Sequence, residues 1–175
     1  MLDERRLPGR QGRLLFAYLA TAPGRAVPRD ELAEVVWGEA VPATWDKALS
    51  VLVSKLRGVL AEGGIDGGSA LTAAFGCYQL DLPDGTWVDV LQAESSVREA
   101  ESLLAADDLA TAKDAAALAE SIVRLPFLPG DGGPWVEAKR RELADVHVRA
   151  LSALADASLR SADAAEAVRW GPSRR

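Results

Sequence analysis

Lysine, serine and arginine side chains recur along residues 44–60, TWDKALSVLVSKLRGVL, at the spacing of one helical face. At about 100° per residue, one arc of this predicted helix is polar and cationic and lacks a carboxylate. The arc holds Lys47, Ser50, Val51, Ser54, Lys55, Arg57 and Gly58. Side chains of these types bind phosphates and the edges of bases. The stretch is therefore a candidate DNA-recognition helix, with a merely solvated face as the alternative.

The opposite arc of the same stretch is apolar, and it offers a surface by which the helix can attach to a scaffold. It holds Ala48, Leu49, Leu52, Val53, Leu56, Val59 and Leu60. A recognition helix needs such an anchor together with a slim polar face that enters the major groove. On that polar face Ser50 and Ser54 allow close approach, and Val51 suits a thymine methyl. Arg57 is the candidate for a bidentate guanine contact, worth about 1–3 kcal/mol of discrimination.

Basic residues near the start of this helix and upstream of it are candidate phosphate contacts. Lys47 can reach a phosphate or a base, and Arg10, Arg13, Arg25 and Arg29 lie in turns and loops that would flank the groove. The predicted DNA-contacting set is Arg13, Arg29, Lys47, Ser50, Val51, Ser54, Lys55 and Arg57.

The surrounding elements have the layout of a winged helix-turn-helix. Two helices are predicted before the recognition stretch, over residues 13–22 and 28–38, and short turns join all three. After it come a glycine-rich loop and two short strands, residues 70–75 and 77–82, around Phe75-Gly76. The hairpin would be the wing. Because no Lys or Arg occurs between Leu60 and Val97, a strong minor-groove contact by this wing is not expected.

A second module is predicted after the turn Pro83-Asp84-Gly85. Helices are expected over residues 89–106, 109–125 and 134–159, then a turn at 161–163 and a fourth helix from 164 to 170. Alanines at the crossing points resemble tetratricopeptide-type packing. The predicted fold is thus mainly α, with a winged helix-turn-helix domain at residues 1–83 and a helical module at 87–170.

The composition of the chain limits which partners and which cellular location can be expected. The chain has 175 residues, is 49% hydrophobic and carries a net charge of −6, all of it in residues 81–175. An acidic helical half would repel DNA and suits a protein partner. The single Cys77, the lack of a signal peptide and the lack of an apolar run of about 20 residues favour a cytoplasmic protein without a disulfide or a membrane span.

No catalytic constellation is found in the sequence. It lacks a phosphate-binding loop, a nucleophile paired with a base and a metal-ligand spacing, so no enzyme activity and no cofactor are expected. Trp37, Trp45, Trp87 and Trp135 are predicted to pack at the ends of elements, and the lone His147 is predicted to lie at a core edge.

Three pieces of sequence, in this order and spacing, resemble one bacterial family: LPGRQGRLLFAYL, VSKLR, and FLPG followed by PWVEAKRREL. The winged-helix part is similar to that of the SARP-type (Streptomyces antibiotic regulatory protein) transcriptional regulators, whose DNA-binding domain is of the OmpR type. The helical part resembles the start of their bacterial transcriptional activation domain. The resemblance covers about residues 7–160. Residues 52–58 read LVSKLRG where the family commonly has HVSRLRR, so this helix carries less positive charge.

The resemblance implies a sequence-specific regulator that binds double-stranded DNA. Its helical module would serve oligomerisation and contact with the transcription machinery, so RNA polymerase subunits and a second copy of the chain are candidate partners. Both ends are expected to be truncated, and the helical module to be incomplete. The alternative is a protein-interaction module, or a truncated paralogue, that dimerises without binding DNA.

Overall fold

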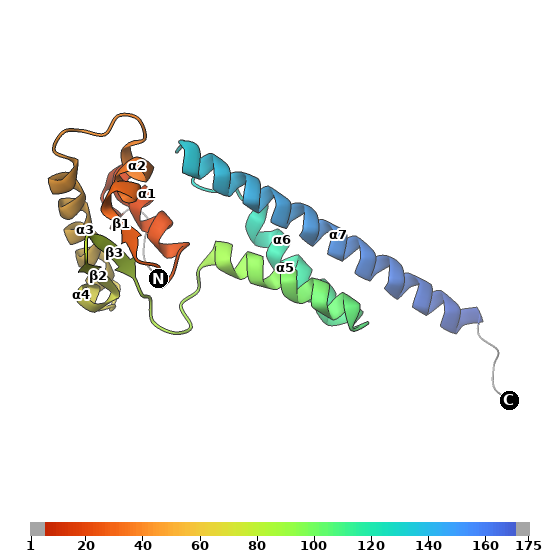
Figure 1. The fold of residues 1–175 in the computed structure, drawn as a ribbon. Helices are drawn as coiled ribbons and strands as arrows, with labels where there is room; N and C mark the ends of the chain where they lie inside the picture. The colour runs from red at the N-terminus through yellow and green to blue at the C-terminus, as the bar shows by residue number, and fades with distance from the viewer. Residues whose placement is uncertain (1–5, 171–175) are drawn as a thin grey trace. The chain divides into compact units, whose positions relative to one another are not determined.

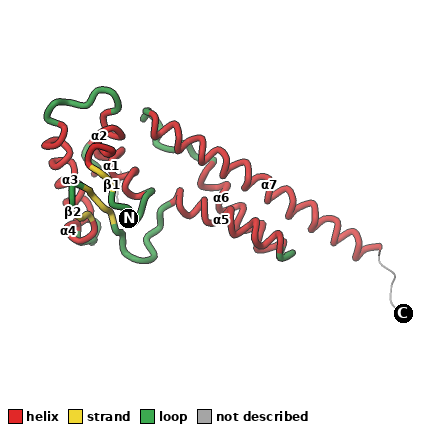
Figure 2. Tube along the Cα trace, viewed as in Figure 1, coloured by secondary structure: helices red, strands yellow, loops and turns green. Residues whose placement is uncertain are grey.

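The computed structural model describes residues 6–170, with side chains described as far as residue 162. It consists of two compact units. The first unit takes in the chain up to Val88 together with Gly130–Val136, and the second takes in Asp89–Pro129 and the chain from Glu137 onward. Figures 1 and 2 show the order of the elements, which are mainly helical as predicted. The sequence-based boundaries, residues 1–83 and 87–170, remain a prediction.

Three helices form the body of the first unit: α1 (Gly9–Ala20), α2 (Arg29–Trp37) and α3 (Trp45–Glu62). Their apolar faces meet in one core, to which Leu15, Leu32 and Leu56 each contribute a buried side chain. The predicted helical stripes are therefore the faces that pack. α1 begins four residues earlier than the predicted residue 13. Pro8 precedes its first residue, where a proline disturbs no helical hydrogen bond, and the glycines of the first turn do not stop the helix.

A small antiparallel sheet completes the first unit. It contains β1 (Val27–Pro28), β2 (Leu71–Ala74) and β3 (Cys77–Leu80) in the order β1-β3-β2. β2 and β3 form the predicted wing, and Phe75 and Gly76 join them with φ angles of 50° and 74°. β1 was not predicted, because two residues ending in a proline give no alternating pattern. It is defined only by its pairing with β3.

The glycine-rich stretch after α3 contains a short helix, α4 (Gly67–Ala70), where a flexible loop was predicted. The side chain of Asp66 caps it by accepting a hydrogen bond from the amide of Gly68 at 3.0 Å. Gly67 is buried, and a β-carbon placed on it would lie 2.2 Å from the carbonyl oxygen of Arg57. A glycine is required here because α4 crosses directly over the backbone of α3.

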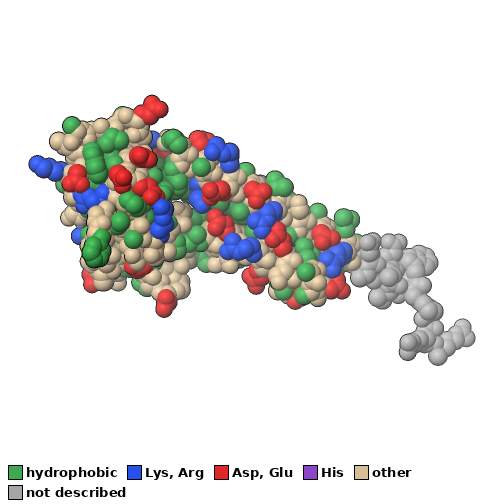
Figure 3. All heavy atoms as spheres, in the orientation of Figure 1, with side chains coloured by type: hydrophobic (Ala, Val, Ile, Leu, Met, Phe, Trp, Pro, Cys, Tyr) green, Lys and Arg blue, Asp and Glu red, His purple; other side chains and the backbone are tan. Residues whose placement is uncertain are grey.

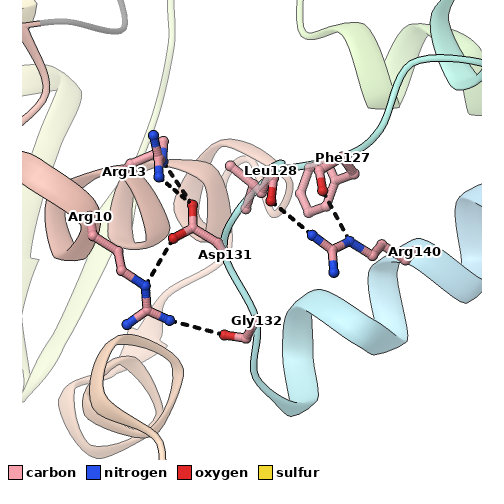
Figure 4. A network of polar contacts seen from close by, with 7 residues as sticks. All are labelled: Arg10, Arg13, Phe127, Leu128, Asp131, Gly132 and Arg140. Atoms are coloured by element: carbon pink, nitrogen blue, oxygen red, sulfur yellow. Dashed lines mark hydrogen bonds and ion pairs between the residues drawn. The ribbon is translucent and has the colours of Figure 1, made fainter.

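The segment Gly130–Val136 is bound to α1 of the first unit by charge. The carboxylate of Asp131, with no exposed side-chain area, accepts hydrogen bonds from Arg10 Nε at 2.9 Å and Arg13 Nε at 2.8 Å. Figure 4 shows both guanidinium groups directed at this carboxylate, with Arg10 also donating to the Gly132 carbonyl. Trp135 adds an edge-to-face contact with Tyr18, with ring centroids 5.0 Å apart. A short segment distant in sequence is thus an integral part of this unit.

The second unit consists of α5 (Asp89–Ala105), α6 (Leu109–Val123) and the part of α7 (Pro134–Trp170) that begins at Glu137. Fully buried alanines, among them Ala93, Ala100 and Ala116, lie where the helices meet, as the predicted small-residue packing requires. Arg149 on α7 donates two hydrogen bonds to the carboxylate of Glu101 on α5, at 2.8 and 2.7 Å. These bonds lower the pKa of Glu101.

The predicted turn at 161–163 and the separate fourth helix are wrong, because α7 runs without a break to Trp170. This stretch has no proline or glycine to end the helix. The hydroxyl of Ser161 donates to the carbonyl of Ala157 one turn back, at 2.6 Å, so the serine is accommodated within the helix. Among the described residues, no helix is both long enough and apolar enough to cross a bilayer.

Replacing Gly67 with alanine should destabilise the first unit by about 1–3 kcal/mol, because the added methyl group meets the α3 backbone rather than a movable side chain. Gly58→Ala is the matched control, since this exposed helical position has open space around it. It should stabilise the protein by about 0.5–1 kcal/mol. Urea denaturation of both variants tests this. Equal effects of the two substitutions would contradict the close crossing of α4 and α3.

Asp131→Ala should lower the free energy of unfolding by about 1–3 kcal/mol, because two arginines lose a buried acceptor while keeping partial access to water. Asp145→Ala, which removes an exposed carboxylate 3.9 Å from Arg149, should cost less than about 1 kcal/mol. Denaturation followed by tryptophan fluorescence measures both. If the two variants unfold at the same urea concentration, the segment is not an energetic part of the unit.

Candidate nucleic-acid interface

The outward face of α3 is polar and accessible along three turns. Lys47, Val51, Ser54, Lys55 and Gly58 are all exposed. The leucines at 49, 52, 56 and 60 are buried on the opposite side, so the predicted division of the helix into two arcs matches its burial. The helix therefore has the anchored back and open front that insertion into a groove requires.

Lys47 and Lys55 are the uncommitted charges on this face. Within the described residues, neither lysine makes a hydrogen bond or an ion pair with another side chain or with the backbone. They lie two helical turns apart, with Val51 and Ser54 between them. This face thus offers two lysine side chains that are not held by other residues, with two small side chains between them. A helix that contacts two phosphates and the base edges between them would need such an arrangement.

Arg57 lies at one edge of the exposed face, and its side chain is half-buried. Its Nε donates to the carbonyl oxygen of Leu71 at 2.8 Å, so it joins α3 to the first residue of the wing. The predicted guanine contact is untested. The structure adds a second role for Arg57, because this bond fixes β2 against the helix.

Arg29 joins α2, α3 and the sheet through a single guanidinium group. It donates to Asp46 Oδ1 at 2.8 Å and to Ser50 Oγ at 2.9 Å, both in the first turns of α3. A third bond of 2.6 Å reaches the hydroxyl of Tyr78 on β3, and the guanidinium carbon lies 5.0 Å from the centre of that ring. Only 24% of the Arg29 side chain is exposed. The structure thus places this predicted phosphate contact in a network that joins α3 to α2 and β3.

Asp46 is the residue of this region that sequence reasoning missed. The predicted polar arc was free of carboxylates, yet Asp46 is exposed in the first turn of α3. Its charge is paired with Arg29, so it does not stand open beside the lysines. No helical spacing could have signalled this pair, because its partners lie 17 residues apart on different helices.

The remaining predicted arginines are also engaged with carboxylates. Arg13 binds Asp131, as described above, and Arg25 donates to Glu31 Oε2 at 2.8 Å. Glu31 also accepts a hydrogen bond from Tyr18. Burial raises the pKa of Tyr18, and this bond to Glu31 raises it further. The contacts among Tyr18, Arg25 and Glu31 thus join α1 to α2.

The surface view in Figure 3 shows basic and acidic side chains interspersed, without a single broad basic area on the drawn face of the described residues. A DNA contact on this face would therefore depend on a few placed side chains rather than on a general positive field.

The tryptophans and His147 were predicted to be packing residues, and the structure contradicts this for Trp87. Trp37 and Trp45 pack against the core of the first unit as predicted. Trp87 does not, because 60% of its area is exposed. The Nε2 atom of His147 lies 3.7 Å from a carboxylate oxygen of Glu120, at the edge of the second unit. No group of three potential metal ligands occurs in the part of the chain that the structure describes.

Three comparisons place this geometry among known proteins. Residues 4–72 match the family described as transcriptional regulatory protein, C terminal. The regulatory protein AfsR of Streptomyces coelicolor is 30% identical over 158 residues, which are 90% of this chain and 15% of AfsR. The structure of Mycobacterium tuberculosis EmbR in complex with a low-affinity phosphopeptide superposes with a TM-score of 0.80 at 27% identity, over 91% of this chain and 42% of EmbR.

The chain spans less than half the length of either relative. The match to the regulator family covers α1 to α3 and the start of the wing, and both relatives align through the helical unit as well. The winged helix followed by an alanine-packed helical unit agrees with these matches. These matches confirm the resemblance of the chain to the SARP-type bacterial transcriptional regulators.

Proposed function

We propose that this chain binds double-stranded DNA in a sequence-specific manner, with α3 in the major groove. The observation that carries the proposal is the open face of α3, where two lysines without a partner among the described residues flank small side chains. The carboxylate in the first turn of this helix, Asp46, is paired with Arg29. Because Arg29 pairs with Asp46, that carboxylate does not stand as an uncompensated negative charge beside the lysines. The match of residues 4–72 to a family of transcriptional regulators supports the same function.

We assign the DNA contacts according to whether each side chain already has a partner within the protein. Lys47 and Lys55 would meet phosphates, and Val51 and Ser54 would meet base edges. Ser50 shares its hydroxyl with Arg29 and with the carbonyl of Asp46, so it would contact DNA only through this network. Arg13 and Arg29 would act by positioning α1 and α3 rather than by direct phosphate contact.

The helical unit is proposed to serve protein contacts. The whole net charge of −6 lies in residues 81–175, so this part would be repelled by the phosphate backbone. RNA polymerase subunits and a second copy of the chain are the proposed partners. A chain that dimerises without DNA affinity is the competing function, and the experiments below distinguish the two.

Lys55→Ala should weaken DNA binding and reduce the slope of log affinity against log salt by about 1, because one phosphate contact is lost. The matched control is Lys113→Ala, an exposed lysine on α6 that should change neither quantity. The probe is a duplex selected from a random library on the wild-type chain, with binding measured by fluorescence anisotropy at several salt concentrations. If the wild-type chain selects no duplex at low salt yet sediments as a dimer, the competing function holds.

Arg57→Ala separates the two roles of that residue. If its bond to Leu71 is what matters, the variant should lose about 1 kcal/mol of stability and weaken binding to all duplexes alike. If Arg57 reads a guanine, the variant should keep its melting temperature and lose discrimination at one base pair. We expect the first pattern, measured by thermal unfolding and by binding to single-base variants of the selected duplex.

A further inference from the structure

The tip of the wing presents one large side chain to solvent. Phe75 is fully exposed, at 104% of its reference area, whereas the other large apolar residues of the hairpin, Leu71, Tyr78 and Leu80, are buried. Folding buries phenylalanine far more often than it leaves one bare. An exposed aromatic ring at the tip of the hairpin therefore suggests contact with another molecule.

Phe75 also has a backbone conformation that its residue type disfavours. Its φ of 50° lies in the left-handed region, and Gly76 follows with a φ of 74°. Two-residue hairpin turns of this kind prefer asparagine followed by glycine. A bulky residue held there costs of order 1–3 kcal/mol, and such strain persists where it serves a site.

The wing tip is held firmly beside the start of the recognition helix. The carbonyl of Gly76 accepts a hydrogen bond from the amide of Arg29 at 3.1 Å, and Cys77 pairs with Pro28 in the sheet. The side chain of the same Arg29 binds Asp46 and Ser50 on α3. One residue thus connects the wing tip to the first turns of α3, so a duplex lying on the face of α3 would pass close to Phe75.

The chemistry of the tip excludes a phosphate contact but suits an apolar one. No Lys or Arg occurs anywhere between Leu60 and Val97, so the wing cannot bind DNA through counterion release. Apolar side chains, phenylalanine among them, act differently in the minor groove: they wedge between base steps, partly unstack them and bend the duplex. Such a wedge needs a rigid, slim support, which the two-residue turn supplies.

We propose that Phe75 is an apolar wedge that enters the DNA minor groove next to the site of α3 and partly unstacks one base step. The proposal rests on the DNA-binding function proposed above. It makes Phe75 a specificity-determining residue, because flexible pyrimidine–purine steps unstack most easily and would be favoured at that position. The wing thereby contributes affinity that does not depend on salt.

Phe75→Asn tests the wedge without threatening the fold, because asparagine is the preferred residue at this position of the turn. The probe is the duplex selected on the wild-type chain, labelled at both ends so that energy transfer reports bending. We expect an unchanged or higher melting temperature, about tenfold weaker binding, an unchanged salt slope and a smaller bend. Phe75→Leu, which keeps an apolar wedge, should retain most of the affinity. Trp87→Ala removes another exposed aromatic and should bind like the wild type.

The outcomes separate the two proposals. If the wild-type chain binds no duplex, the proposed function fails and the wedge fails with it. If the wild type binds and Phe75→Asn matches it in affinity and bend, only the wedge is overturned. A reduced salt slope in Phe75→Asn would also overturn it, since that would indicate a lost phosphate contact. So would unchanged DNA binding combined with lost binding to RNA polymerase, because Phe75 would then contact protein.

Discussion

Burial of the leucine arc of α3 is the interaction on which the first unit depends. Leu49, Leu56 and Leu60 lie at the point where α1, α2 and the sheet converge, and each is at most 1% exposed. Burying a leucine side chain contributes about 1.5–3 kcal/mol, so this arc alone supplies much of the stability expected of a small domain. Because the same helix carries the open lysine face, the energy that folds the unit also presents its candidate binding surface.

Local periodicity was enough to predict the longer helices and the wing, though not the four-residue α4, because each is defined by residues a few positions apart. The leucines of α3 and the alternation around Tyr78 are patterns of this kind. The predictions that failed needed other information. β1 exists only through its partner strand, and α7 continues through Ser161 because that side chain bonds backward within the helix. Polar residues without a proline or glycine were too weak a signal for a helix end.

The sequence predicted which side of α3 is exposed, but it did not predict the partners of the arginines around it. Exposure along α3 follows from helical geometry, whereas the partners of Arg13, Arg29 and Arg57 lie 14 to 118 residues away in the sequence. Arginine carries the same charge at a DNA phosphate and in an internal ion pair, so composition cannot separate the two uses. The three-dimensional contacts show which arginines have internal partners, and among the described residues Lys47 and Lys55 have none.

The attachment of Gly130–Val136 to α1 bears on how the chain folds as it is synthesised. The first unit is discontinuous in sequence, since α5 and α6 lie between Val88 and the segment that carries Asp131. A ribosome that has released α1 to β3 has not yet released the acceptor for Arg10 and Arg13. The winged helix therefore reaches its final set of ion pairs only after the helical hairpin that follows it has emerged. A gene rearrangement that cuts after Val88 would separate the first unit from its segment Gly130–Val136.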